Sequence, residues 1–436
     1  MKSRTSFALG FLALIAVGAV VLMMPFCRAD GLRGDFMSSL FTAFSAVCVT
    51  GLTVVDVGRE FSTTGQVVLM VLVELGCLGL MTCGTFFLIA IGRRLSLARE
   101  FSLMNAYGVE QIQGLRGLIC WVVCSMLVIE GLFAAVLYLH FGSWYEALFY
   151  SIMSYCNAGF GLESDSLASF PRGWPVVVMG VETILGGIGF LVIYNLCTFK
   201  FIHRISGARG RLSLHTRIVL RFTVYLLAIT FLAFLAVEWN LSLKDMSLTD
   251  RAVVGFYQAV TPRTCGFCVI PTESLHPLTR LIYECLMFIG GAPGSAAAGM
   301  KVTTLAVILY TATAMCRGET ETVMDRRLIP TEIVRESLVI LMAIVMFAVI
   351  VTGALFVTEA QSGISSEALF FEAVSAVTTT GLSVGDTTAS LSSAGRVVIM
   401  VAMFIGRLGA LTVVLMIGDR ESKRHVRFPS EELVVG

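Results

Sequence analysis

The chain has 436 residues, of which 56% are hydrophobic and only 14% are charged. Soluble proteins carry about a quarter charged residues, so this composition and a mean hydropathy of +0.86 exclude an ordinary soluble protein and indicate an integral membrane protein. The formal net charge of +1 gives no reason to expect nucleic-acid binding, and no basic cluster with interleaved aromatic residues is present.

Eight apolar runs are long enough to cross a bilayer as helices, which takes about 20 residues. They lie near 6–26, 66–91, 117–140, 174–197, 218–238, 276–315, 336–358 and 394–419. The first run follows Lys2 and Arg4 as in a signal peptide. It is longer than the usual core of about 7–15 residues, so we expect a retained helix.

Shorter segments separate the two members of each pair of runs. They lie near 36–50, 144–158, 250–265 and 365–380. These segments are too short to span the bilayer and predict re-entrant half-helices, which a membrane tolerates only where protein or a water-filled cavity surrounds them. Each unit is therefore expected to consist of a helix, a half-helix with its loop, and a second helix.

A glycine motif closes each of these segments. A phenylalanine is followed ten residues later by glycine and then Leu or Phe, in the pairs Phe41/Gly51, Phe149/Gly159, Phe256/Gly266 and Phe371/Gly381. A second glycine motif begins 25, 27, 24 and 25 residues further on, at Gly76, Gly186, Gly290 and Gly406. Two linked motifs that recur four times predict a fourfold internal repeat.

The repeat sets the expected fold class and domain organisation. We predict an all-α integral membrane protein with four parallel helix–pore loop–helix repeats around a central pore. The predicted boundaries are 1–97 for repeat 1, 98–208 for repeat 2, 209–325 for repeat 3 with a broken second helix, and 326–436 for repeat 4 with the C-terminal tail.

The distribution of Lys and Arg predicts the orientation. Twenty of them fall on the side that holds both termini and the loops between repeats, and eight fall on the opposite side. The positive-inside rule places the termini in the cytoplasm, with all four glycine loops opening to the outside. Parallel repeats of this kind fit a pore better than a rocking carrier built from inverted repeats.

The four loops supply the candidate ion ligands. A dehydrated cation needs oxygen ligands on all sides, and backbone carbonyls that face one axis can supply them. Glycine suits such a loop because it adopts positive φ, and the C-terminal end of each half-helix adds a negative partial charge. One such glycine could simply break a helix, whereas four in register favour a selectivity filter. The predicted filter residues are Val49, Thr50, Gly51, Asn157, Ala158, Gly159, Thr264, Cys265, Gly266, Thr379, Thr380 and Gly381.

Three basic residues, Arg263, Lys301 and Arg407, fall inside predicted membrane segments, where a charge usually faces a cavity or a partner. Arg407 occupies the slot that Cys77, Gly187 and Gly291 fill in the other repeats. We expect it to project toward the pore as part of a gate. The alternative is a structural ion pair with Glu74, Glu182 or Glu284. Arg263, next to Thr264, is expected to brace the third loop.

The second apolar run of repeat 3 is rich in small residues and is interrupted by proline, which disfavours a continuous helix. We interpret it as a mobile intramembrane gating loop; close helix packing through small residues is the alternative. The predicted gate residues are Gly290, Gly291, Ala292, Pro293, Gly294, Ser295, Ala296, Ala297, Ala298 and Gly299, together with Lys301 and Arg407.

The filter loops, the Gly-Gly and Gly-Arg motifs, the stretch from Ile289 to Lys301 and the tail 427–436 resemble the membrane subunits of the bacterial Trk/Ktr potassium uptake family. Eight spans without extra N-terminal helices resemble its shorter, Ktr-type branch. The chain departs from the usual pattern at Cys77, Cys265 and Ala297-Ala298. The resemblance identifies the four loop glycines with selectivity glycines, the 290–299 stretch with a gating loop and Arg407 with a pore arginine.

The resemblance implies potassium uptake across the bacterial plasma membrane through a channel-like pore, with potassium held by the filter carbonyls. It also implies a homodimer and a cytoplasmic KtrA-like nucleotide-binding regulatory ring. Glycine at position 51, rather than serine, favours potassium over sodium. The alternative is a sodium-coupled or less selective monovalent cation carrier. No acid–base or nucleophile constellation suggests an enzyme, and we expect no cofactor in this chain, since Cys265-x-x-Cys268 lacks a second pair of metal ligands.

Overall fold

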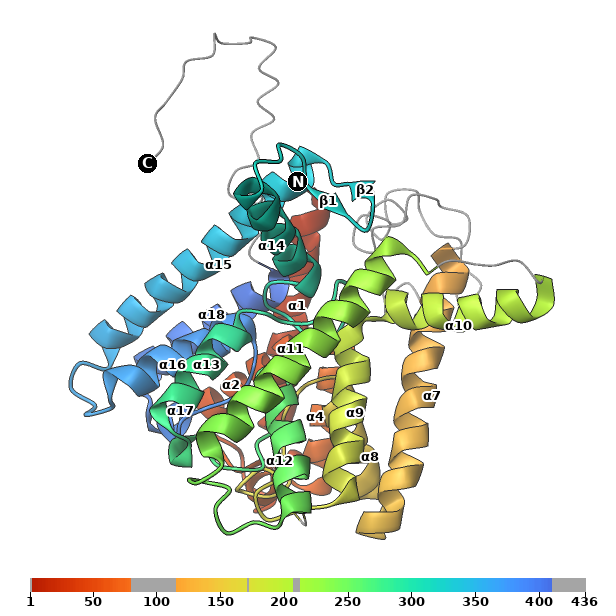
Figure 1. Ribbon diagram of the computed structural model, residues 1–436. Coiled ribbons are helices and arrows are strands. Elements are labelled where there is room, and N and C mark those ends of the chain that lie inside the picture. The colour runs from red at the N-terminus through yellow and green to blue at the C-terminus, as the bar shows by residue number, and fades with distance from the viewer. Residues whose placement is uncertain (1, 80–114, 171, 207–211, 410–436) are drawn as a thin grey trace.

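The structure is a computed structural model that describes residues 2–79, 115–170, 172–206 and 212–409. Over these residues the regular secondary structure is helical, with short 3-10 turns, apart from one small antiparallel hairpin, β1 (Val323–Met324) with β2 (Arg327–Leu328). The described helices pack side by side into one body (Figure 1). The tail 427–436 and the second halves of the predicted spans 66–91 and 394–419 lie outside the described residues.

Four sets of helices follow one another along the chain, and each set contains a helix, a shorter buried helix and a further helix. The first set is α1 (Lys2–Leu22), α2 (Phe36–Cys48) and α4 (Thr63–Leu78), with η1 (Pro25–Cys27) and α3 (Val57–Glu60) in its loops. The second set is α7 (Leu115–Phe141), α8 (Trp144–Tyr155) and α9 (Trp174–Ile188), followed by α10 (Phe190–Ser206).

The third set is α11 (Leu214–Glu238), α12 (Leu248–Val260) and the pair α13 (Pro277–Met287) and α14 (Val302–Cys316), with η2 (Thr272–Ser274) between α12 and α13. The fourth set is α15 (Thr331–Thr358), α16 (Ser366–Thr378) and α18 (Ser393–Leu408), with α17 (Thr387–Ser390) before α18. Within the first, second and fourth sets, all three main helices contact one another.

The short helices α2, α8, α12 and α16 begin and end at clear signals. Asp35, Ser247 and Ser365 cap α2, α12 and α16 by accepting the backbone N–H of the residue three positions on, whereas Ser143 before α8 makes no such bond. The Ser38 N–H bond to the Asp35 carboxylate also lowers the pKa of Asp35. Most of the residues in these helices are buried, so they form the interior of the body.

Lengths and compositions agree with a membrane protein. Among the described helices, Gly117–Phe141, Leu214–Glu238 and Thr331–Thr358 are each long and apolar enough to cross a bilayer. Large apolar side chains stand exposed along α15, for example Met346, Val349 and Ile350. An exposed apolar helix face of this length suits contact with lipid and not with water.

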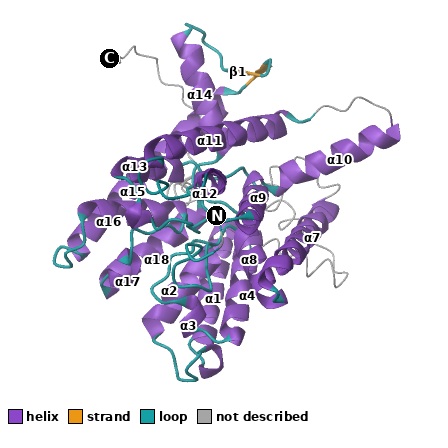
Figure 2. Cartoon of the chain, turned by 60° about the horizontal axis from the view of Figure 1, so that its bottom comes forward, coloured by secondary structure: helices purple, strands orange, loops and turns teal. Residues whose placement is uncertain are grey.

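The prediction of an uninterrupted second span near 174–197 is wrong. The helices α4, α9 and α18 each end at a glycine with positive φ: Gly79 (76°), Gly189 (83°) and Gly409 (85°). After Gly189 the chain turns by 93° into α10, which extends away from the body (Figures 1 and 2). Hydropathy continues through these glycines, but the helix does not, because a residue with positive φ ends an α-helix.

Candidate functional site

The four glycine loops meet, and each touches the next. A Cβ placed on any of these glycines would come within 3.1 Å of the carbonyl oxygen that precedes the glycine of the following loop, and the fourth loop returns to the first. The glycine–carbonyl pairs and their Cβ–O distances are Gly51 with Ala158 (2.3 Å), Gly159 with Cys265 (2.7 Å), Gly266 with Thr380 (3.1 Å) and Gly381 with Thr50 (2.0 Å). The contacts therefore close a ring in chain order, which we call the glycine ring.

The four loops also share one backbone conformation. Each glycine has φ between 70° and 94°, and the residue two positions earlier is left-handed although it is not glycine. Those residues are Val49 (55°), Asn157 (56°), Thr264 (64°) and Thr379 (50°). A left-handed non-glycine residue costs about 1 kcal/mol, and more when it is β-branched, so four in matching positions indicate a shape that the surroundings impose.

The short helices brace these loops from behind. In the first loop, Ser45 accepts the N–H of Thr50 on its carbonyl (2.8 Å) and the N–H of Gly51 on its hydroxyl (3.0 Å). In the fourth loop, the Ser375 carbonyl accepts the N–H of Thr380 (2.8 Å). These bonds occupy the backbone N–H groups from the helix side, which leaves the carbonyl oxygens as the groups available at the ring.

Side-chain hydroxyls brace the second and third loops. The Tyr150 hydroxyl accepts the N–H of Leu162 at 3.1 Å, and the Thr261 hydroxyl donates to the carbonyl of Phe267 at 2.6 Å. On the short helix of the fourth set, Glu372 occupies the position that Tyr150 has in the second set. Glu372 is fully buried and accepts hydrogen bonds from Ser383 and Thr388. Sequence reasoning missed Glu372; an acid inside an otherwise apolar half-helix was the available signal.

Several hydroxyls of the loops have no hydrogen-bond partner within the described protein. They are the Oγ1 atoms of Thr50, Thr264 and Thr379, each on a side chain that is almost wholly buried. A buried hydroxyl without a partner is unfavourable by about 1–3 kcal/mol, so such atoms are common where water or an ion completes the contacts.

The second glycine motif packs three of the helices against the loops. Gly76, Gly186 and Gly406 lie so close to the carbonyls of Val47, Tyr155 and Val377 that an added Cβ would come within 2.2, 1.9 and 2.2 Å of the oxygen. Each of these carbonyls belongs to the residue four positions before a ring glycine. The fourth glycine, Gly290, instead packs against Ala298 of its own segment, at 1.7 Å.

Residues 288–301, which we call the crossing segment, connect α13 to α14 without a helix. Ile289 and Met300 bridge the two ends of the segment, with Gly290 N–H bonded to the Met300 carbonyl at 2.9 Å. The segment also contacts the end of α9. Ala292 and Ala296 donate their N–H groups to the carbonyls of Gly187 (2.9 Å) and Gly186 (3.2 Å). Close packing of a continuous small-residue helix is therefore not the explanation of this stretch.

Arg407 reaches across to the crossing segment. Its guanidinium donates to the carbonyls of Ala296 (2.6 Å), Gly76 (2.7 Å) and Cys77 (3.3 Å). Within the described part of the chain it forms no salt bridge, so the alternative of an ion pair with Glu74, Glu182 or Glu284 is not supported. Lys301 similarly donates to the Ala297 carbonyl at 2.6 Å. Two cations thus hold neighbouring carbonyls of one segment.

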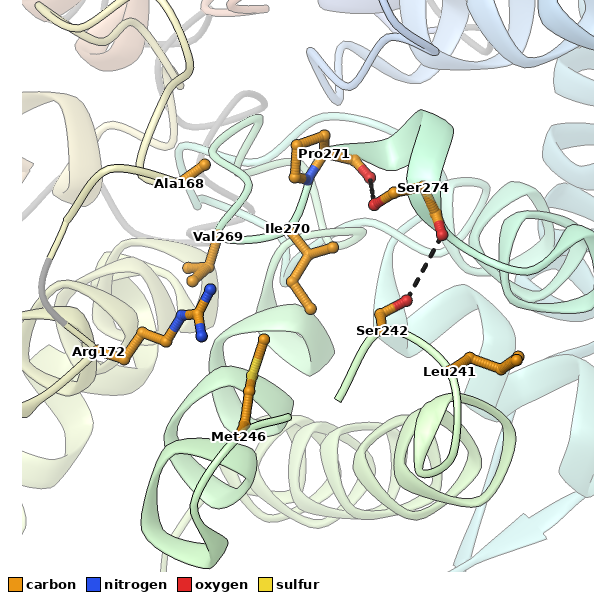
Figure 3. Close-up of a pocket in the computed structure, with 9 residues that line it drawn as sticks. All are labelled: Ala168, Arg172, Leu241, Ser242, Met246, Val269, Ile270, Pro271 and Ser274. Carbon is orange, nitrogen blue, oxygen red and sulfur yellow. Dashed lines mark hydrogen bonds between the residues drawn. The ribbon is translucent and has the colours of Figure 1, made fainter. Parts of the chain in front are cut away.

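Arg263 is buried beside the third loop, and its Nε has no partner among the described residues. The expectation that it braces that loop remains a prediction. A depression of about 500 Å³ lies between loops of the second and third sets (Figure 3). Its lining includes Arg172, Val269 and Ile270. It holds a single charged side chain, so it offers no chemistry that the sequence singled out.

The family model described as "TrkH: Cation transport protein" matches residues 11–426. Over 98% of its length the chain is 34% identical to "Ktr system potassium uptake protein B" of Bacillus subtilis and 33% identical to "Potassium/sodium uptake protein NtpJ" of Enterococcus hirae, in both cases covering 96% of the relative. The crystal structure of the potassium transporter TrkH from Vibrio parahaemolyticus superposes with a TM-score of 0.77 at 17% identity, covering 96% of this chain and 85% of that one.

These similarities define the class of protein. The chain belongs to the TrkH family of cation transport proteins, which are membrane proteins and not enzymes. Within the family it is similar over its whole length to Ktr-type uptake proteins, which confirms the resemblance seen in the sequence.

Proposed function

We propose that this protein takes up potassium through a pore whose selectivity filter is the glycine ring. The single observation that carries the proposal is the cyclic contact of four loops from four parts of the chain, each glycine lying against the next loop's carbonyl. A closed ring of carbonyls is the arrangement that replaces the hydration shell of a potassium ion. Full-length similarity to two uptake proteins named for potassium supports the choice of ion.

In this proposal the ion is the cargo, and Val49, Thr50, Gly51 and their counterparts in the other loops hold it through backbone oxygens. The short helices bring the negative ends of their dipoles to the ring, which favours a cation there. The unpartnered hydroxyls of Thr50, Thr264 and Thr379 would provide further oxygens for the ion or its water.

We propose that the crossing segment and Arg407 form the gate. The segment is held by backbone hydrogen bonds to α9 and by a guanidinium from α18, so it links two helices that also pack against the ring. A fixed positive charge near the path raises the barrier for a cation by about 4 kcal/mol at 4 Å with an effective dielectric of 20. Opening would require Arg407 and the segment to separate or move together.

We further propose a homodimer in the plasma membrane with cytoplasmic termini and a KtrA-like nucleotide-binding ring as regulator. The distribution of Lys and Arg supports the orientation. The assembly follows from the resemblance to Ktr-type systems. Light scattering of the purified protein, alone and with such a ring, tests both parts of the assembly.

A second candidate is uptake of both potassium and sodium. The name of the Enterococcus hirae relative, which mentions both ions, favours it. The decisive experiment is ion flux in proteoliposomes with potassium, rubidium and sodium in turn. Selective uptake of potassium and rubidium supports the first candidate, equal uptake of all three supports the second, and no uptake of any of them contradicts both.

A further inference from the structure

Three acidic side chains gather around α8. Glu74 comes from α4, Glu130 from α7 and Glu182 from α9, and all three of these helices pack on α8 (Figure 1). Glu130 is 2% exposed and Glu182 is 0% exposed. Glu74 and Glu182 both lie close enough to Glu130 to interact with it electrostatically.

The contacts of Ser151 indicate a proton on this cluster. The Ser151 hydroxyl lies 2.8 Å from the Glu130 carbonyl oxygen and also within bonding distance of a Glu182 carboxyl oxygen. A serine has one proton to give, so both contacts are satisfied when Glu182 is protonated and donates to Ser151.

One carboxyl oxygen of the cluster has no partner at all. Glu182 Oε2 is buried and forms no hydrogen bond within the described residues. An ionised carboxylate in such a place would be strongly unfavourable, whereas a neutral acid is tolerated. The site is thus built to hold a proton and to resist losing it.

No basic side chain among the described residues forms an ion pair with the cluster. The other titratable groups that face it are Cys77 at the end of α4, Tyr155 on α8, Cys156 directly after α8 and, through Thr183, Tyr257 on α12. None of these is basic, and no salt bridge joins the three acids to a Lys, Arg or His of the described chain. The described residues also contain no group of three or more His, Cys, Asp and Glu side chains placed to hold a metal ion.

The cluster is connected to the crossing segment through two helix ends. Glu74 lies two residues before Gly76, whose carbonyl accepts from Arg407. Glu182 lies four residues before Gly186, whose carbonyl accepts the N–H of Ala296. Arg407 in turn donates to the Ala296 carbonyl, so these contacts form a closed circuit. Repulsion between ionised acids on α4, α7 and α9 would move both helix ends that hold the segment.

We propose that Glu74, Glu130 and Glu182 form a proton-binding site whose occupancy sets how firmly the crossing segment is held. The protonated cluster keeps α4 and α9 together and the segment in place; loss of a proton separates them and releases it. This inference rests on the proposed function, because it assigns the crossing segment the role of gate.

The first experiment needs no transport. Infrared spectroscopy of the purified protein in nanodiscs, titrated in pH, should show a carbonyl band of protonated carboxylic acid that persists at neutral pH and decreases in alkali. Glu182→Gln should remove part of that band, and Glu332→Gln, an exposed acid at the start of α15, should not. A spectrum in which Glu182→Gln leaves the band unchanged overturns the proposal.

The second experiment measures potassium flux in proteoliposomes against pH, without any regulator. We expect flux to rise with pH in the unmodified protein and in Glu332→Gln. In Glu182→Gln and Glu74→Gln, which cannot ionise, we expect loss of that rise and a constant low flux. A rise that persists in folded Gln variants contradicts this inference alone, whereas absence of selective flux in every variant contradicts the proposed function.

Discussion

The second glycine motif has two different outcomes in this molecule. In α4, α9 and α18 its first glycine lets the helix press against a carbonyl behind the glycine ring. In the third set the same motif comes just after α13 has ended, and Gly290 presses against Ala298 of the crossing segment. The nearby Pro293 cannot donate a helical hydrogen bond. Equivalent glycines thus support the ring at three positions and fold a separate segment at the fourth.

The comparison predicts its largest effect at the three supporting glycines. Gly406→Val would force a side chain against the Val377 carbonyl, which an added Cβ already approaches to 2.2 Å. We expect loss of folded protein or a loss of stability of several kcal/mol, since overpacking alone costs about 1–3 kcal/mol and backbone cannot move aside easily. Thermal unfolding in detergent measures it. Gly353→Val on α15, where an added Cβ meets nothing within 4 Å, is the control.

Shortening the crossing segment of the third set should raise ion flux and leave the protein folded. Deletion of Ala292–Ala298 takes away the proposed obstruction, together with the Ala296 carbonyl that binds Arg407 and the Ala297 carbonyl that binds Lys301. We expect potassium flux without the regulator to rise while the protein remains folded. If flux through the correctly inserted protein stays the same or falls, the segment serves packing and not gating.

Arg407 connects a helix that supports the glycine ring with the crossing segment, because it extends from α18 to that segment. Arg407→Gln removes the charge and should raise the rate of uptake at least about tenfold, the change expected for 1.4 kcal/mol of barrier, with potassium selectivity kept. Arg396→Gln, on the same helix but bonded to the Ala389 carbonyl, is the matched control. A destabilised Arg407→Gln protein with no gain in rate would show that the arginine is only structural.

The smallest effect concerns the short helices behind the ring. Ser365→Ala removes the cap of α16 and should lower the stability by about 1 kcal/mol, as measured for other N-caps. Ser143→Ala, before the uncapped helix α8, should change it much less. Equal losses in the two variants would mean that the caps do not distinguish these helices.

Much of this arrangement could be predicted from the sequence, because it depends on residue types that have few alternatives. Glycine marks the ring at Gly51 and its counterparts, and Pro293 with its small neighbours marks the place where the helix of the third set is missing. The helix ends at Gly79, Gly189 and Gly409 were not predicted, since hydropathy averages over a window and continues past a single glycine.

The partners of Arg407 could not be predicted for a different reason. It binds backbone carbonyls, which every residue carries, so no side chain in the sequence marks them. The contacts of Glu372 and the gathering of Glu74, Glu130 and Glu182 around α8 depend on which helices become neighbours. That information exists only once the helices are packed.

The most direct test of the central claim is the ratio of potassium to sodium flux through Gly51→Ser. Its side chain would meet the Ala158 carbonyl and disturb the ring, so we predict a clear fall in the ratio. The control is Gly142→Ser. Gly142 also has a positive φ (68°), but an added Cβ would meet nothing within 4 Å, so this variant should keep the ratio of the unmodified protein. An unchanged ratio in folded Gly51→Ser protein would contradict the assignment of the glycine ring as the selectivity filter.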